Sequence, residues 1–136
     1  MIIPTYKPGK EFEELICRLQ KQTYSIHRII IINTQTGVFP TELESEPYQI
    51  EIMHIRPEDF DHGGTRNMGA SISHADIVLY MTQDAVPADE HLIEKFANVF
   101  EKHPEIGIAY GRQLPREDCN IIERYTRRFN YPEKSR

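Results

Sequence analysis

Hydrophobic positions along the chain repeat with two different periods, and the two periods alternate. Continuous apolar runs of four or five residues, rich in β-branched side chains, are typical of strands buried on both faces of a parallel sheet. Such runs predict strands at 29–32, 77–81 and 106–110, and shorter apolar stretches predict two more at 2–3 and 50–55.

Three helices are predicted between these strands from apolar residues spaced three or four apart. The first covers about 11–21, the second covers about 65–74 after a loop at 61–64, and the third follows Asp89, which is predicted to cap it. Two prolines and several polar residues make 38–48 a predicted loop. Because strands alternate with helices, the sequence predicts an α/β fold with a mostly parallel sheet flanked by helices.

The composition narrows the class of protein. With 136 residues the chain is long enough for one domain and too short for two, so we expect 1–136 to form a single domain. Apolar residues make up 39% and charged residues 27%, as in globular rather than disordered chains. A net charge of -5 argues against nucleic acid as a partner, despite a local basic cluster of Arg124, Arg127 and Arg128. No apolar run approaches the roughly 18 residues that a membrane helix needs.

The two ends of the chain and its cysteines add further expectations. The chain enters a strand almost at once and ends in a polar stretch, so we expect a piece of a longer protein, with 116–136 as an extended or poorly packed tail. No secretory signal opens the chain, and Cys17 and Cys119 show neither a disulfide framework nor the spacing of a zinc site. These features fit a reducing, cytoplasmic compartment.

Polar residues that follow predicted strands are candidate ligand contacts, because ligands of parallel α/β sheets bind at the carboxyl ends of the strands. Asp84 follows the predicted strand at 77–81. A single carboxylate there can bind a divalent metal that also takes phosphate oxygens from a substrate. An ordinary aspartate in a turn ahead of Pro87 is an equally good interpretation.

The segment 61–67 is a second candidate, for phosphate. Gly63 and Gly64 let the backbone approach a ligand closely, the helix start offers N–H groups, and Arg66 offers a planar cationic fork. A glycine turn with a solvated arginine is the more ordinary interpretation, and His62 alone is more often a surface or capping histidine.

Residues at the ends of the first two strands could bind a nucleoside. Tyr6 could stack on a base, while Thr5 and Asn33 could bond to the edge of that base. Each has an ordinary alternative, which is edge packing for the tyrosine and a strand-ending turn for the asparagine. Their shared position on one edge of the predicted sheet is the stronger argument.

Motifs of several other enzyme classes are absent from the sequence. It contains no GxxxxGKS/T P-loop, no GxGxxG dinucleotide-binding signature and no GxSxG nucleophile elbow. A receiver domain would carry an acidic pair after the first strand, where this chain has Pro-Thr-Tyr at 4–6. The sequence therefore argues against a P-loop NTPase, a dinucleotide-binding dehydrogenase, a serine hydrolase and a receiver domain.

Several segments together resemble family 2 glycosyltransferases. Residues 2–6, Ile-Ile-Pro-Thr-Tyr, are similar to the strand that opens the family, and 64–70, Gly-Thr-Arg-Asn-Met-Gly-Ala, are similar to its middle block. Residues 82–87, Thr-Gln-Asp-Ala-Val-Pro, stand where the family carries its metal-binding DxD-type motif. The resemblance covers nearly the whole chain. Within the family the chain looks most similar to bacterial rhamnosyltransferases, in the segments 60–67, 81–85, 110–115 and 128–132.

The resemblance implies a Rossmann-like GT-A nucleotide-diphospho-sugar transferase fold, present here in part. It implies an inverting transfer of a sugar, with rhamnose as a candidate, from a UDP- or dTDP-linked donor to a glycan or lipid-linked acceptor. The implied setting is bacterial cell-wall or polysaccharide biosynthesis, in the cytoplasm or peripherally at the inner face of the membrane. Asp84 would bind a divalent metal, Mg²⁺ or Mn²⁺. Carried over by position, the residues that would bind the nucleotide sugar are Pro4, Thr5, Tyr6, Asn33, His62, Gly63, Arg66, Asn67 and Gln83.

The chain departs from the family pattern in two places. Asn33 stands where the family usually has an aspartate that reads the pyrimidine, and the Thr-Gln-Asp motif at 82–84 has one carboxylate where a full DxD has two. The general base that deprotonates the acceptor is expected beyond Arg136, so this chain alone should bind donor but transfer little. Two alternatives stay open: a non-catalytic nucleotide-binding or interaction module, and a nucleotidyltransferase. The Gly-rich basic loop of the latter is poorly matched by 5–10.

Overall fold

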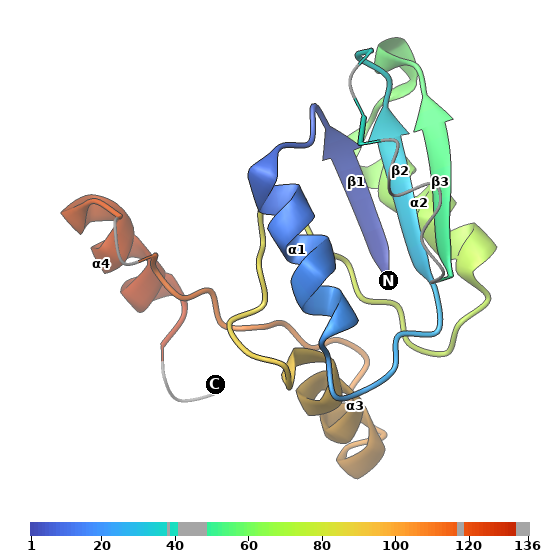
Figure 1. Cartoon of the computed structure of the whole chain (residues 1–136). Helices are drawn as coiled ribbons and strands as arrows, with labels where there is room; N and C mark the ends of the chain where they lie inside the picture. The colour runs from blue at the N-terminus through green and yellow to red at the C-terminus, as the bar shows by residue number, and fades with distance from the viewer. Residues whose placement is uncertain (38, 41–48, 117–118, 133–136) are drawn as a thin grey trace. The chain divides into compact units, whose positions relative to one another are not determined.

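Three parallel strands form a sheet in the computed structural model, which describes residues 1–37, 39–40, 49–116 and 119–132. The strands β1 (Ile2–Tyr6), β2 (Ile29–Thr34) and β3 (Ile50–Ile55) lie side by side in the order β1-β2-β3 (Figure 1). Every residue of the central strand β2 is buried, which explains its continuous isoleucine run. The predicted parallel α/β arrangement is confirmed for these three strands.

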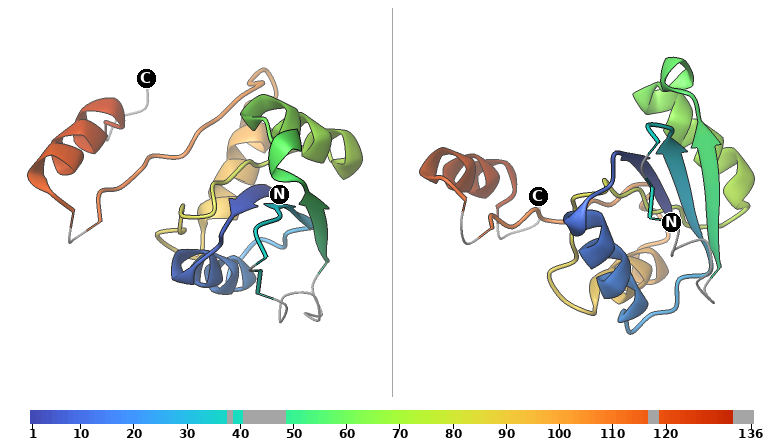
Figure 2. Two further views of the ribbon diagram at one scale, coloured as in Figure 1. Left: turned by 90° about the horizontal axis from the view of Figure 1, so that it is seen from above. Right: turned by 45° about the horizontal axis from the view of Figure 1, so that its top comes forward.

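Helices cover both faces of this sheet. The helix α1 (Lys10–Gln20) lies on one face, and α2 (His62–Ser73) lies on the other (Figures 1 and 2). Successive side chains of a strand point to opposite faces, so neighbouring isoleucines of one strand serve different helices. Ile31 belongs to the cluster beneath α1, whereas Ile30 and Ile32 belong to the cluster that contacts α2.

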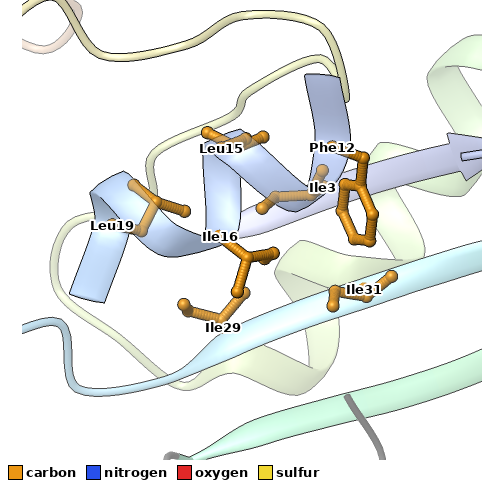
Figure 3. Packing of buried hydrophobic residues seen from close by; sticks show 7 residues of the cluster. All are labelled: Ile3, Phe12, Leu15, Ile16, Leu19, Ile29 and Ile31. Carbon is orange, nitrogen blue, oxygen red and sulfur yellow. The ribbon is translucent and has the colours of Figure 1, made fainter. Parts of the chain in front are cut away.

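The α1 face contains the larger part of the core, shown in Figure 3. Burying one such large apolar side chain contributes roughly 1.5–3 kcal/mol, so this cluster is the main source of stability in the described structure. The residues of the cluster are Ile3, Phe12, Leu15, Ile16, Leu19, Ile29 and Ile31.

The α2 face depends on a close approach between helix and sheet. A Cβ atom built on Gly69 would lie 2.7 Å from Cγ2 of Ile2, so only glycine fits at this contact. The helix also begins earlier than predicted, at His62 rather than at about residue 65. Asp61 is its N-cap, because the carboxylate accepts the Gly64 N–H and the Asp61 carbonyl accepts the Thr65 N–H at 2.8 Å. The predicted loop at 61–64 is therefore the first turn of the helix.

The predicted strand at 77–81 is wrong in extent. Only one isolated parallel bridge, between Ile2 and Tyr80, joins this segment to β1. Two backbone hydrogen bonds make the bridge: the Ile2 N–H donates to the Leu79 carbonyl at 2.9 Å, and the Met81 N–H donates to the Ile2 carbonyl at 3.1 Å. Ile77 and Tyr80 stay exposed, so the apolar run is not the doubly buried strand that its pattern predicted.

The predicted strand at 106–110 is also wrong, because the structure assigns no strand to these residues. No strand pairs with this segment in the described part of the chain, and the side chains of Ile108 and Tyr110 are exposed. Alternation of apolar residues indicates a strand only when a partner strand pairs with it.

The helix α3 (Leu92–Lys102) follows a turn in which the His91 N–H donates to the Asp89 side chain at 2.9 Å. Asp89 thus caps the turn that leads into the helix and lies two residues ahead of the N-cap position, residue 91, so its predicted role as N-cap is wrong in position. Residues fall into two compact units, 1–94 and 95–136, and the boundary lies inside α3. Each unit is described by itself.

The second unit contains α4 (Ile121–Asn130), in the region expected to be an extended or poorly packed tail. The Glu123 N–H donates to the side chain of its N-cap, Asn120, at 2.8 Å, and none of the residues of α4 is buried. The helix is local structure formed by its own cap and side-chain pairs. No helix in the described part of the chain is long and apolar enough to cross a membrane.

Candidate functional site

The carboxyl ends of β1 and β2 bring two of the candidate residues into direct contact. Thr5 and Asn33 are register partners, and the Thr5 hydroxyl donates to Oδ1 of Asn33 at 3.0 Å. Both side chains are only 2% exposed. Pro4, just before them in β1, is half-buried, whereas Tyr6 at the strand end is exposed. The ends of the two strands therefore form a buried polar contact beside an exposed aromatic ring.

The polar contact continues to the third strand, through a residue that sequence analysis missed. His54 is the register partner of Asn33 in β3, and Nδ2 of Asn33 lies 3.0 Å from Nδ1 of His54. The ring of Phe39 meets the His54 imidazole edge-on, with centroids 5.5 Å apart. In the sequence, His54 is a polar residue near the end of an apolar strand, which could have drawn attention to it. The strand register that places it beside Asn33 cannot be predicted from the sequence.

Gln83 ties the turn that carries Asp84 to the end of β1. The Tyr6 N–H donates to Oε1 of Gln83 at 2.7 Å, and Nε2 of Gln83 donates back to the Tyr6 carbonyl at 3.0 Å. The turn itself is closed by the Ala85 N–H, which donates to the Thr82 carbonyl at 3.1 Å. The exposed carboxylate of Asp84 is the side chain next to this double hydrogen bond. The structure thus brings Asp84 to the same edge as Tyr6.

The backbone after Tyr6 holds a second residue that sequence analysis did not single out. Lys7 has φ 47°, in the left-handed region that costs a residue with a Cβ roughly 1–2 kcal/mol. Its ammonium lies 5.3 Å from the centroid of the Tyr6 ring, within the range of a cation–π contact. One strained residue therefore places a positive charge beside the exposed aromatic side chain.

The start of α2 lies at the same edge of the sheet as the strand arrowheads (Figure 1). His62, Gly63 and Asn67 are exposed there, and Arg66 is half-buried. Nη1 of Arg66 donates to the His62 carbonyl at 2.9 Å, so part of its fork is bonded to its own helix. The N-cap carboxylate of Asp61 also takes up one of the helix N–H groups, which weakens this end as an anion site compared with the uncapped helix start that was predicted.

Three hydroxyl groups near these elements are buried and have no hydrogen-bond partner in the described structure. They are Oγ1 of Thr34, the last residue of β2, Oγ1 of Thr36, two residues further on, and Oγ1 of Thr65, in the first turn of α2. A buried hydroxyl left without a partner costs about 1–3 kcal/mol. Such atoms favour a site that gains polar contacts when a ligand or water is present.

Two charged residues that follow β3 form an ion pair. Arg56, just after β3, binds Asp59 through Nε at 2.8 Å and Nη2 at 3.0 Å. The pKa of the Arg56 guanidinium is raised, first by its hydrogen bonds to the Asp59 carboxylate and second by the negative charge of that carboxylate. Within the described residues no group of three histidine, cysteine, aspartate or glutamate side chains could hold a metal ion by itself. A metal at Asp84 would therefore need oxygen atoms from a bound substrate.

A separate hollow exists within residues 95–136. It is lined by Arg112, Leu114, Pro115, Arg128 and Pro132. Its arginines include one of the basic cluster noted in the sequence. None of the candidate site residues lines it.

Comparisons with known proteins agree with this fold. The whole chain, residues 1–136, matches the model of Glycosyl transferase family 2. The sheet has structural neighbours in the GT-A class of nucleotide-sugar transferases, and this class is the one that the fold defines. The chain belongs to glycosyl transferase family 2.

Two curated relatives are O-antigen chain rhamnosyltransferases. RfbN of Salmonella typhimurium is 36% identical over 136 residues, covering 99% of this chain and 43% of that protein. WbaN of Salmonella anatum is 35% identical over 133 residues, covering 96% of this chain and 42% of that protein. The chain therefore spans about two fifths of the length of the curated relatives that it matches.

The solved structures with a similar fold include TarS of S. aureus. The crystal structure of TarS 1–349 matches with a TM-score of 0.66 at 17% identity, covering 85% of this chain and 37% of that chain. Structures of the same fragment with UDP and with UDP-GlcNAc match with TM-scores of 0.63 and 0.61, at 16% and 17% identity. At this identity the likeness shows the GT-A fold and nothing more.

Proposed function

We propose that this chain is the donor-binding part of a glycosyltransferase that transfers a sugar from a nucleotide diphosphate. One observation carries the proposal. The Gln83–Tyr6 double hydrogen bond brings the only carboxylate of the DxD-type turn, Asp84, to the strand ends where parallel α/β sheets bind ligands. The UDP and UDP-GlcNAc named with the structural neighbours support a nucleotide-sugar donor.

The exposed residues of the edge take the direct roles in this proposal. Tyr6 stacks on the nucleobase, while Arg66 and Asn67 at the start of α2 contact the diphosphate, with His62 and Gly63 beside them. Binding the diphosphate requires the Arg66 fork to leave the His62 carbonyl, which the ion pair with phosphate favours because charge-assisted bonds are the stronger ones.

The bonded residues of the edge take supporting roles. Both polar atoms of the Gln83 side chain are used by the backbone of Tyr6, so Gln83 positions the turn rather than binding the sugar. Thr5 and Asn33 are buried at the ends of β1 and β2, and Pro4 precedes Thr5 in β1. These residues shape the nucleoside pocket from within the sheet.

Asp84 is the one residue proposed to hold a divalent cation, Mg²⁺ or Mn²⁺. Its exposed position fits this role, because Mg²⁺ is commonly bound through one or two carboxylates together with substrate phosphates. When bound, such an ion supplies positive charge that stabilises the leaving diphosphate. Arg66 supplies positive charge to the same group from the protein.

The reaction proposed for the longer protein is a single, inverting displacement at the anomeric carbon. A carboxylate base takes the proton of the acceptor hydroxyl, a contribution typically of about 10²–10⁴-fold, and we place that base beyond Arg136. The names of the two curated relatives favour rhamnose as the sugar and an O-antigen chain as the glycan acceptor. We place this sugar transfer in the cytoplasm or at the inner face of the membrane.

Titration calorimetry with UDP and dTDP, with and without Mn²⁺, tests the proposal. We expect at least one diphosphate to bind, and Asp84→Asn to remove the part of the affinity that depends on metal. Asp76→Asn is the matched control, because Asp76 is an exposed aspartate of the same unit outside the proposed site. If neither diphosphate binds, an interaction module without nucleotide is the better description. If Asp84→Asn and Asp76→Asn behave alike, Asp84 is not the metal ligand.

A further inference from the structure

The helix α4 carries its large apolar side chains on one side. Successive residues of an α-helix are about 100° apart around its axis, so these side chains fall within an arc of about 100°. Tyr125 and Phe129, one turn apart, stack with ring centroids 6.4 Å apart, which shows that they lie on the same side. We call this surface the apolar stripe; it consists of Ile121, Ile122, Tyr125 and Phe129, all of them exposed.

Arginines border the apolar stripe. The helical repeat places Arg124 and Arg128 along one edge of the stripe, and both are exposed. Arg127 lies on the opposite side, where its Nε donates to the Glu123 carboxylate at 2.9 Å. Since α4 contains three arginines and a single acidic residue, the helix combines an exposed apolar side with a net positive charge.

Charge is divided unequally between the two units of the chain. Residues 95–136 contain nine lysines and arginines against six aspartates and glutamates, whereas residues 1–94 contain seven against fifteen. The excess of positive charge therefore belongs to the unit that carries the apolar stripe. A negatively charged partner fits this unit better than a second copy, which would bring the positive charge of one α4 against that of another.

The arginine-lined hollow of residues 95–136 combines the same two chemistries. Its lining contains the arginines Arg112 and Arg128 together with Leu114, Pro115 and Pro132. Guanidinium groups suit phosphate, and the leucine and prolines offer apolar contact beside them. Arg128 belongs both to this hollow and to the border of the apolar stripe, so the two features are continuous.

We propose that α4 lies flat on an anionic lipid bilayer, with the apolar stripe among the acyl chains and the arginines at the lipid phosphates. A lipid surface presents phosphate above hydrocarbon, which matches the arrangement of charge beside apolar side chains on α4 and in the hollow. The ten residues of α4 are roughly 15 Å long, about half of the hydrocarbon thickness, so the helix lies in the plane of the surface and does not cross it.

A single tryptophan tests the position of the apolar stripe, because the chain has no tryptophan of its own. In Phe129→Trp we expect the emission to shift to the blue, and its quenching by acrylamide to fall, when vesicles of phosphatidylglycerol and phosphatidylethanolamine are added. Tyr24→Trp is the matched control, because Tyr24 is an exposed aromatic residue of the unit 1–94. Its emission should not change with the same vesicles.

Sedimentation with these vesicles tests charge and apolar contact separately. Arg128→Gln should weaken binding about fivefold, the contribution of one arginine near an anionic surface, whereas Arg56→Gln, the same change at an exposed arginine of 1–94, should stay within about twofold. Phe129→Ser should weaken binding about five- to tenfold because apolar area is lost, and Tyr24→Ser is its control. All four positions are exposed, so unchanged circular dichroism should accompany each substitution.

The proposal is overturned if the chain does not sediment with the anionic vesicles, if it binds vesicles of phosphatidylcholine equally well, or if Phe129→Trp and Tyr24→Trp respond alike. Emission of Phe129→Trp that is already shifted without vesicles also overturns it, because protein then covers the stripe; a shift that grows with protein concentration identifies a second copy. UDP binding is a separate measurement, because α4 contains none of the residues proposed for the donor site. If UDP does not bind, the donor-binding function fails and the membrane contact stands.

Discussion

The helices α1 and α4 have similar amphipathic sequences, but the apolar side chains of α1 are buried and those of α4 are exposed. Both are short and amphipathic, with 11 and 10 residues. The apolar side chains of α1 are 0–3% exposed, packed on the sheet, as Figure 3 shows. The apolar side chains of α4 are 67–82% exposed, and they are Ile121, Ile122, Tyr125 and Phe129.

This difference shows that an apolar pattern in the sequence does not by itself determine whether a helix face is buried. An apolar stripe at helical spacing tells which face of a helix will be buried, but burial needs a partner surface. Helix α1 meets the isoleucines of a parallel sheet, and its stability comes from that packing. Helix α4 relies on local bonds, in which Arg127 binds Glu123 at 2.9 Å and Gln113 at 2.7 Å, and Tyr125 stacks on Phe129.

Removal of a core aromatic ring should give the largest effect. Phe12 is fully buried between α1 and the sheet, so Phe12→Ala should lower the free energy of unfolding by about 3–5 kcal/mol. Urea denaturation followed by circular dichroism measures this loss. A loss below about 1 kcal/mol would mean that α1 does not anchor the unit.

A methyl group added at Gly69 should test the close contact between α2 and the sheet. At Gly69 overpacking against Ile2 costs about 1–3 kcal/mol, and the better helix propensity of alanine offsets about 1 kcal/mol of that. Gly69→Ala should therefore destabilise the chain by up to about 2 kcal/mol in the same urea assay. Gly63→Ala is the control, because its Cβ would lie at an ordinary 3.5 Å from the Asp61 carboxylate. Equal effects of the two substitutions would contradict the close approach of α2.

Removal of the N-caps should distinguish a helix packed on the sheet from one that is not. Asp61→Ala removes the cap of α2 and should cost about 1 kcal/mol of unfolding free energy, since α2 unfolds together with the sheet. Asn120→Ala removes the cap of α4 and should lower helicity locally, seen as faster amide exchange in 121–130, without moving the urea midpoint. A shift of the midpoint by Asn120→Ala would show that α4 unfolds with the rest of the chain.

The smallest effect should come from the exposed aromatic face of α4. Phe129→Ala should change the free energy of unfolding by less than about 0.5 kcal/mol, as for ordinary surface positions. The contrast with Phe12→Ala, the same substitution in the other helix, is the direct comparison of the two faces. A loss of several kcal/mol would mean that α4 is covered by a partner surface in solution.

The sequence predicted those parts of the fold that local pattern decides. The isoleucine run of β2, the four apolar positions of α1 and the parallel arrangement of three strands were predicted from periodicity and the alternation of elements, and all are present. The runs at 77–81 and 106–110 have the same local character, but the first pairs with β1 at a single bridge and the second is not a strand. Strand pairing is a property of distant residues, so these two runs misled the prediction.

The candidate site shows the same division between local and distant information. Asp84, Arg66 and Tyr6 could be named from motif and strand position, and they lie on the predicted elements. The Gln83–Tyr6 pair and the contact between Asn33 and His54 could not be predicted, because they depend on strand register and on contacts 77 and 21 residues apart. The N-cap at Asp61 was missed because the predicted loop left α2 without its first turn.

Mapping of nucleotide binding on backbone amides tests the central claim most directly. In ¹H–¹⁵N correlation spectra titrated with UDP or dTDP, we expect shifts at the strand ends, the 82–85 turn and the first turn of α2. Amides of 121–130 should stay unchanged. Absence of shifts, or shifts confined to the arginine-lined hollow of residues 95–136, would contradict a donor site at the carboxyl edge of the sheet.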